Sequence, residues 1–125
     1  MYERHQFAEL QGKTCTRVEQ IGDAQIEFDC EDGTRFALFH SQDCCETVVV
    51  ESVTGDLSDL VGTPILLAEE ATSEEDPPGY KHKYQPESQT WTFYKLRTIK
   101  GSVDIRWHGE SNGYYSETVD FEKLD

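Results

Sequence analysis

The chain has 125 residues, 25 of them acidic and 11 basic, which gives a formal net charge of −14 at pH 7. This length suits one domain, spanning residues 1–125, and a charge of this sign repels the phosphates of DNA or RNA. No apolar run approaches the roughly 20 residues of a membrane helix, and no N-terminal signal pattern is present. We therefore expect a cytoplasmic protein. Four cysteines in such a compartment predict free thiols.

The first half of the chain has the turns and alternation of an antiparallel β-meander. Apolar side chains fall on every second position from Ala24 to Cys30, which places them on one face of a strand. Asp32-Gly33 is a tight hairpin signal. Residues 36–39 are apolar on both faces, which predicts a buried central strand. The expected strands span residues 13–19, 24–30, 34–40 and 47–53.

The middle of the chain predicts one helical turn and one long loop. Residues 55–60 have the pattern of a single helical turn with Asp56 as its N-cap, and a strand is expected to start at Ile65. Residues 69–89 carry five acids between Glu69 and Asp76, followed by three prolines. We interpret this segment as a mobile acidic surface loop, because neither flank is large enough to fold alone.

The C-terminal third has the clearest strand pattern. Val103, Ile105 and Trp107 alternate with polar residues, so one face of this strand is expected to pack and the other to face solvent. Strands are predicted over residues 90–100, 102–108 and 114–121. The expected fold class is mainly β, α+β at most: an antiparallel meander or twisted sheet with one helical turn and a long acidic loop.

A cluster of potentially reactive side chains occupies residues 40–46. His40, Asp43, Cys44 and Cys45 are the candidates for a metal site, and a thiol beside an imidazole also suits nucleophilic catalysis. The spacing favours neither, because adjacent cysteines point apart and no second Cys or His pair completes a ligand set. We interpret the segment as a structural turn with buried thiols, in which Asp43 caps backbone amides and His40 is a hydrogen-bonded histidine. No catalytic residue and no cofactor are predicted.

A basic and aromatic stretch covers residues 81–106. It holds six basic and two acidic side chains, a net charge of +4, whereas the remainder holds 5 basic and 23 acidic ones, a net charge of −18. Aromatic rings stack on bases, and Arg or Lys pairs with phosphate. The alternative is that these cations neutralise acidic strands beside them. The predicted ligand-binding residues of this stretch are Trp91, Phe93, Lys95, Arg97 and Arg106.

A turn at residues 107–115 completes the candidate set. His108, Glu110 and Ser111 suggest a hydrolytic set, but their closeness on one turn makes a productive hydrogen-bond geometry unfavourable, and no Gly-x-Ser-x-Gly motif is present. Asn112 and Tyr114 fit better as ligand contacts at the tip of a loop.

Two segments carry a resemblance to known proteins: His40-Ser41-Gln42-Asp43-Cys44-Cys45-Glu46 with residues 55–57, and residues 90–95 together with 111–116. They resemble the signature of an uncharacterised family of small phage and bacterial proteins. The chain is also similar to phage proteins that counter Thoeris defence, which are oligomeric sponges for cyclic ADP-ribose-type signals. That second resemblance implies a homo-oligomer that holds a nucleotide with aromatic and arginine side chains.

The sequence thus predicts a non-enzymatic phage or mobile-element accessory protein that sequesters a small anionic nucleotide-type signal. The alternative is an acidic mimic of nucleic acid that inhibits a basic host protein such as a nuclease or CRISPR effector. Its partner is therefore expected to be a small ligand or a basic protein, with no direct nucleic acid and no membrane. The dependence of binding on salt distinguishes the two hypotheses, because binding to a basic protein weakens as ionic strength rises.

Overall fold

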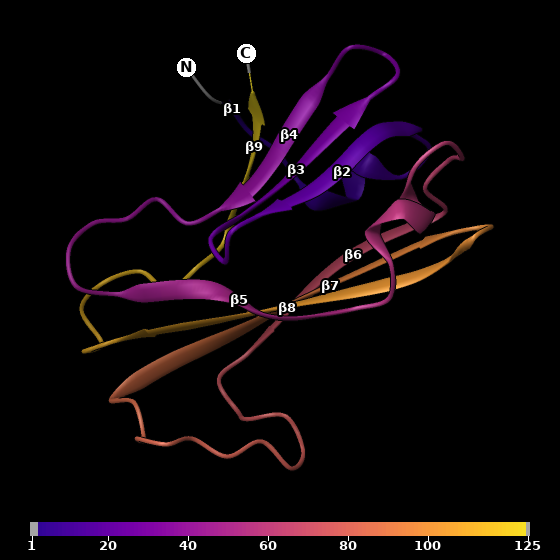
Figure 1. Cartoon of the computed structure of the whole chain (residues 1–125). Helices are drawn as coiled ribbons and strands as arrows, with labels where there is room; N and C mark the ends of the chain where they lie inside the picture. The colour runs from indigo at the N-terminus through magenta and orange to yellow at the C-terminus, as the bar shows by residue number, and fades with distance from the viewer. Residues whose placement is uncertain (1–2, 125) are drawn as a thin grey trace.

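The computed structural model describes residues 3–124, which form two antiparallel β-sheets (Figure 1). The first sheet has the order β1 (Glu3–Arg4), β9 (Asp120–Leu124), β4 (Arg35–Phe39), β3 (Gln25–Cys30) and β2 (Cys15–Ile21). The second has the order β5 (Thr47–Thr54), β8 (Gly101–Ser111), β7 (Ser88–Thr98) and β6 (Leu67–Ser73). The mainly β, antiparallel fold class is confirmed. Within the described residues no helix has the length and apolar character to cross a membrane.

The first sheet contains the predicted meander. Strands β2, β3 and β4 follow one another as antiparallel neighbours, and β4 lies between β3 and β9, as its two apolar faces predict. The side chains of Ile26, Phe28 and Cys30 are all buried on the inner face of β3. Gly33 has a φ of +88°, the left-handed conformation that the hairpin turn requires and that glycine adopts at little cost.

The core lies between the two sheets, and side chains of both contribute to it. Phe7 enters it from a 3-10 turn, η1 (Phe7–Leu10), and its ring centroid lies 4.6 Å from that of Tyr94 and 5.4 Å from that of Phe121. Trp107 and Ile105 pack inward from β8. The 3-10 turn η1 was not predicted from the sequence, although Gln6 and Glu9 carry the capping-box pattern at its start. The predicted turn is η2 (Leu57–Leu60), and Asp56 caps it by accepting a hydrogen bond from Ser58 N.

The acidic loop is shorter than predicted. Residues 69–73 continue β6 and pair with β7, so the connection spans only residues 74–87. The acids at the start of the segment are compatible with a strand here because β6 is the edge of its sheet, where charged side chains reach solvent. Among residues 3–124 the core cluster includes side chains from before and after this loop, such as Ala68 and Tyr94.

The predicted strand over residues 114–121 is wrong. Strand β8 runs on through Ser111, and residues 112–119 leave the second sheet and cross to β9 in the first. Local hydrogen bonding favours the break: Tyr114 N donates to Oδ1 of Asn112, and Gly113 has a φ of +92°. The C-terminal strand therefore completes the first sheet beside β4 instead of extending the β7–β8 hairpin.

Candidate functional site

The predicted ligand residues of β7 and β8 lie on the outer face of the second sheet. Their neighbours Tyr94, Leu96 and Ile105 point inward to the core, so the alternate positions point away from it. The first sheet covers only the inner face, and the 74–87 loop lies on the opposite side of the second sheet (Figure 1). The outer face therefore remains open to solvent except where this loop covers it.

Three of the predicted residues meet in one shallow depression, which we call the outer hollow. Phe93 lies directly across from Arg106 in the β7–β8 ladder, and Lys95 lies two positions further along β7. The hollow has a volume of about 250 Å³. It is lined by Phe93, Lys95, Arg106, Ser52, Thr54, Asp104 and the flanking Tyr94 and Ile105. The side chain of Phe93 is half-buried, so part of its ring is available for stacking.

The cations of the outer face differ in how they are paired. Arg106 Nε donates a 2.6 Å hydrogen bond to Glu51 Oε2, and this bond holds the pKa of Glu51 below its usual range. Lys95 lies between Glu69 and Asp104 in the strand register, yet neither it nor Arg97 forms an ion pair within residues 3–124. A neighbouring acid therefore neutralises the charge of Arg106. Within the described residues, the ammonium group of Lys95 and the guanidinium group of Arg97 have no such partner.

Trp91 does not lie where a ligand could stack on it. Its side chain is 0% exposed because the 74–87 loop covers it: the ring of Tyr80 lies 4.8 Å away, centroid to centroid, and that of His108 lies 4.4 Å away across the ladder. Trp91 Nε1 also donates a 3.1 Å hydrogen bond to Asp76 Oδ1. The stacking role predicted for Trp91 is therefore a misassignment, and its ring anchors the loop to the sheet.

Asp76 is the centre of this anchor. Its Oδ1 also accepts hydrogen bonds from His82 Nε2 at 2.8 Å and from Gln89 Nε2 at 2.9 Å. The bond from His82, the largest cause, lowers the pKa of Asp76. Arg106 extends the cluster, because its guanidinium carbon lies 5.3 Å from the centroid of Trp91 and stacks on it as a cation on a π face.

A second cavity of about 580 Å³ opens beside this anchor, and we call it the loop cavity. Predicted Asn112 lines it, together with His82 and His108. Burial lowers the pKa of His108. Tyr84, 80% exposed, lies at the rim of the cavity. Predicted Tyr114 is 83% exposed and lines none of the cavities described here, so the structure does not bring it together with Phe93.

The 40–46 segment is a structural turn, but the residue that organises it is Glu46. Its buried carboxylate accepts hydrogen bonds from His40 Nε2 at 2.7 Å, from Asp43 N at 2.9 Å and from Cys44 N at 3.0 Å. Burial alone would raise the pKa of Glu46, but these bonds lower it to about 2. The capping role predicted for Asp43 therefore belongs to Glu46, because only its carboxylate points into the turn.

His40 is a hydrogen-bonded histidine, as predicted. Its Nδ1 lies 2.7 Å from the carbonyl oxygen of Thr118, while its Nε2 lies 2.7 Å from Glu46. Both neighbours are acceptors, so the ring makes both bonds only when both nitrogens carry a proton. The imidazole thus ties the turn to the crossing segment before β9 and leaves no nitrogen for a metal.

The cysteines differ from the expected free, buried thiols. Cys44 and Cys45 are exposed and joined by a disulfide, whereas Cys15 and Cys30 are buried free thiols opposite one another on β2 and β3. Across residues 3–124 no group of three or more His, Cys, Asp or Glu side chains has the arrangement of a metal site.

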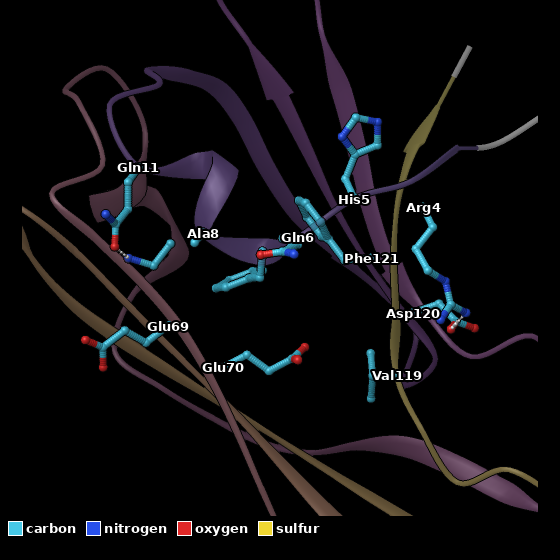
Figure 2. A pocket seen from close by; sticks show the side chains of 12 residues that line it. Arg4, His5, Gln6, Ala8, Gln11, Glu69, Glu70, Val119, Asp120 and Phe121 are labelled. Carbon is cyan, nitrogen blue, oxygen red and sulfur yellow. Dashed lines mark hydrogen bonds and ion pairs between the residues drawn. The ribbon is translucent and has the colours of Figure 1, made fainter.

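A third cavity, of about 690 Å³, lies between the two sheets where β6 faces β9 and η1 (Figure 2). We call it the inter-sheet cavity. No local sequence pattern predicts this cavity, because its lining comes from three distant segments, residues 4–11, 68–70 and 119–121. Only the crossing of residues 112–119 from one sheet to the other brings these segments together.

Comparison with known proteins places the chain in a family without assigning it a function. A model described as a domain of unknown function, DUF7448, matches residues 8–121. Because this match covers most of the chain, the chain belongs to that family. Neither the curated proteins nor the solved structures contain a match to it.

Proposed function

We propose that this member of the DUF7448 family is a binding protein for a small anionic ligand with an aromatic ring, of the nucleotide type, on the outer face of its second sheet. The observation that carries the proposal is the outer hollow, where a half-exposed Phe93 lies between the cations of Lys95 and Arg106. A base stacks on an aromatic face, and the neighbouring cations bind phosphate.

The surroundings of the hollow favour a small ligand over a polymer. The free ammonium of Lys95 and the guanidinium of Arg97 share the outer face of β7 with Phe93, so one ligand can reach all three. The remainder of the chain is strongly acidic and would repel a long polyanion. A mononucleotide or cyclic nucleotide carries few phosphates and meets only the local basic field.

Two details extend the proposal to the size and fate of the ligand. The loop cavity, at about 580 Å³, lies within the range of small-molecule sites, whereas the outer hollow alone is smaller than that range. A nucleotide whose base lies on Phe93 would therefore extend beyond the hollow along β7, toward Lys95 and Arg97. We propose that the ligand is held without being converted, as in sequestration of a signal by a phage or mobile-element protein.

The proposal is tested by thermal denaturation with a panel of ADP-ribose, cyclic ADP-ribose and cyclic dinucleotides. A ligand at a hundredfold excess over its Kd stabilises the fold by about 2.7 kcal/mol, which raises the Tm by several degrees. The bound nucleotide is then recovered and analysed by mass spectrometry, and recovery of the unchanged compound is expected.

No Tm shift with any member of the panel would contradict the proposal. If the protein instead captures a basic nuclease, and the capture weakens steeply between low and high salt, the acidic-inhibitor function replaces it.

A further inference from the structure

We propose that Cys44 and Cys45 form a thiol–disulfide exchange site, whose substrate is a low-molecular-weight thiol. The two cysteines are adjacent in the chain and joined by a disulfide, and both residues are exposed. They lie in residues 40–46, the connection from β4 of the first sheet to β5 of the second (Figure 1). This site is separate from the outer hollow and does not depend on the proposed nucleotide ligand.

The disulfide is not needed to hold the fold together. A cross-link stabilises a protein mainly by restricting its unfolded chain, and the effect grows with the number of residues in the loop that it closes. Two adjacent cysteines close the smallest loop that a disulfide can form. Exposed disulfides are also the more readily reduced ones. Reduction of the Cys44–Cys45 bond should therefore leave both sheets intact and change only the turn.

The turn around the two cysteines is fixed by groups other than their sulfur atoms. The buried carboxylate of Glu46 accepts a hydrogen bond from Cys44 N at 3.0 Å, and Gln42 Nε2 donates to the carbonyl oxygen of Glu46 at 2.7 Å. Gln42 Nε2 also donates to the carbonyl oxygen of Cys44 at 3.4 Å. Opening the disulfide removes none of these bonds, so they keep the two thiols of the reduced pair close together. This proximity favours closure of the disulfide within the chain.

A molecule in the loop cavity can reach one of the two sulfur atoms. Cys45 lines this cavity, whereas Cys44 does not. Lys83 and Glu110 line it too, so the cavity presents both signs of charge to a ligand. A zwitterionic thiol such as glutathione carries carboxylates and an ammonium group that match these charges. The volume of about 580 Å³ is sufficient for a molecule of this size, and its thiol would reach Sγ of Cys45 first.

The exchange proceeds in two steps and consumes two external thiols. The thiolate of the first attacks Sγ of Cys45, the bond to Cys44 breaks, and the electron pair leaves on Sγ of Cys44, which then takes up a proton. The thiolate of the second attacks the external sulfur of the mixed disulfide and releases the Cys45 thiolate, which is also protonated. The protein disulfide is thus reduced to two thiols while two external thiols are oxidised to one disulfide. An external disulfide reverses the sequence.

The other two cysteines provide an internal comparison. Cys15 and Cys30 lie opposite one another on β2 and β3, but both are buried and neither lines the loop cavity. Because an external reagent must reach the sulfur atom, access should decide which pair reacts. We therefore expect exchange at the exposed pair and none at the buried one while the chain is folded.

The experiment follows alkylation of the whole chain by iodoacetamide, located by peptide mass spectrometry. After equilibration with oxidised glutathione, Cys44 and Cys45 should not be alkylated. After treatment with reduced glutathione, both should be alkylated at least about tenfold faster than Cys15 and Cys30. A return to oxidised glutathione should close the pair again. The Tm of the reduced chain should differ from that of the oxidised chain by less than about 5 °C.

Two pairs of variants test the roles of the cavity and of the turn. With one cysteine of the pair replaced, the other can only form a mixed disulfide with oxidised glutathione. This reaction should be faster in Cys44→Ser, which keeps the cavity-lining sulfur, than in Cys45→Ser. Gln42→Ala should slow closure of the reduced pair by about threefold. Ser41→Ala is its matched control, because the Ser41 side chain makes no hydrogen bond within residues 3–124.

Three results with the unaltered chain would each overturn the proposal: alkylation of Cys44 and Cys45 after oxidation, no opening of the pair by reduced glutathione in the folded chain, or equal alkylation rates at all four cysteines. Two results with the variants would also do so. One is an equal rate of closure in Gln42→Ala and Ser41→Ala. The other is an equal rate of mixed-disulfide formation in Cys44→Ser and Cys45→Ser.

Discussion

Arg106 on β8 and Glu51 on β5 are joined across the outer face by a 2.6 Å hydrogen bond from Nε to Oε2. Both side chains are partly buried, at 29% and 25% exposure. The bond fixes the guanidinium against Trp91 at the edge of the outer hollow, and it also offsets the positive charge that a phosphate would meet. Glu51 therefore both orients Arg106 and competes with the ligand for it.

Glu51→Gln is predicted to tighten binding of the nucleotide ligand. The substitution removes the competing charge and leaves an amide of the same shape, so Arg106 is released for phosphate. A partly exposed pair contributes up to about 1 kcal/mol, which corresponds to as much as fivefold in Kd. Isothermal titration of the two proteins with the same nucleotide measures the difference. Weaker binding by Glu51→Gln would mean that orientation of Arg106 matters more than its free charge.

Asp76→Ala is predicted to release the 74–87 loop from the sheet. The substitution removes the acceptor for Trp91, His82 and Gln89 at once. Trp91 should then become more exposed, with a red shift of its fluorescence, and limited proteolysis should cut within the loop about tenfold faster. Glu75→Ala is the control, because the hydrogen bonds recorded for Glu75 involve only its backbone. A similar cleavage rate in both variants would contradict the anchoring role of Asp76.

The lowered pKa of Glu46 predicts how the stability of the fold depends on pH. Its folded pKa of about 2 lies below the ordinary value of 4.5, so its contribution is present above the ordinary pKa and is lost as pH falls toward the folded one. The Tm should therefore decline between about pH 5 and about pH 2.5. Glu46→Gln should have a Tm lower by roughly 5 °C or more at neutral pH, and a shallower decline.

Asp43→Asn is the matched control for Glu46, since its exposed carboxyl lies in the same turn and accepts no hydrogen bond in the described chain. It should keep both the Tm and the pH profile of the unaltered protein. Some decline must remain in Glu46→Gln, because hydrogen bonds also lower the pKa of Asp29 and Glu51. An identical profile for all three proteins would show that Glu46 does not contribute through its charge.

Periodicity was sufficient to predict most of the strands. The alternation around Ile26 and around Ile105 follows from packing one face of a strand against the core, and that pattern is local in the sequence. The partner of the last strand was not predictable in the same way, because β9 pairs with β4, which lies far earlier in the chain: Phe39 pairs with Asp120 and Arg35 with Leu124. Residues 69–73 were missed because an edge strand tolerates charges that resemble those of a loop.

The candidate site was predictable only in part, for a related reason. Strand alternation places Phe93, Lys95 and Arg97 on one face, and the structure keeps them there. The same rule gives Trp91 the same face, but it contains no information about the loop that covers it. The role of Glu46 was equally hidden, since a carboxylate that organises a turn cannot be distinguished by spacing from the neighbouring Asp43.

The most direct test of the proposed function is the affinity of cyclic ADP-ribose for Phe93→Ala and Lys95→Ala, compared with the unaltered chain and with Lys81→Ala. Lys81 is an exposed cation of the 74–87 loop that lines none of the three cavities, so it matches Lys95 in charge but not in place. Loss of base stacking should weaken binding by about tenfold or more in Phe93→Ala, with a smaller loss in Lys95→Ala and none in Lys81→Ala. Equal affinities in all four proteins, or no binding by the unaltered chain, would contradict a nucleotide site at the outer hollow.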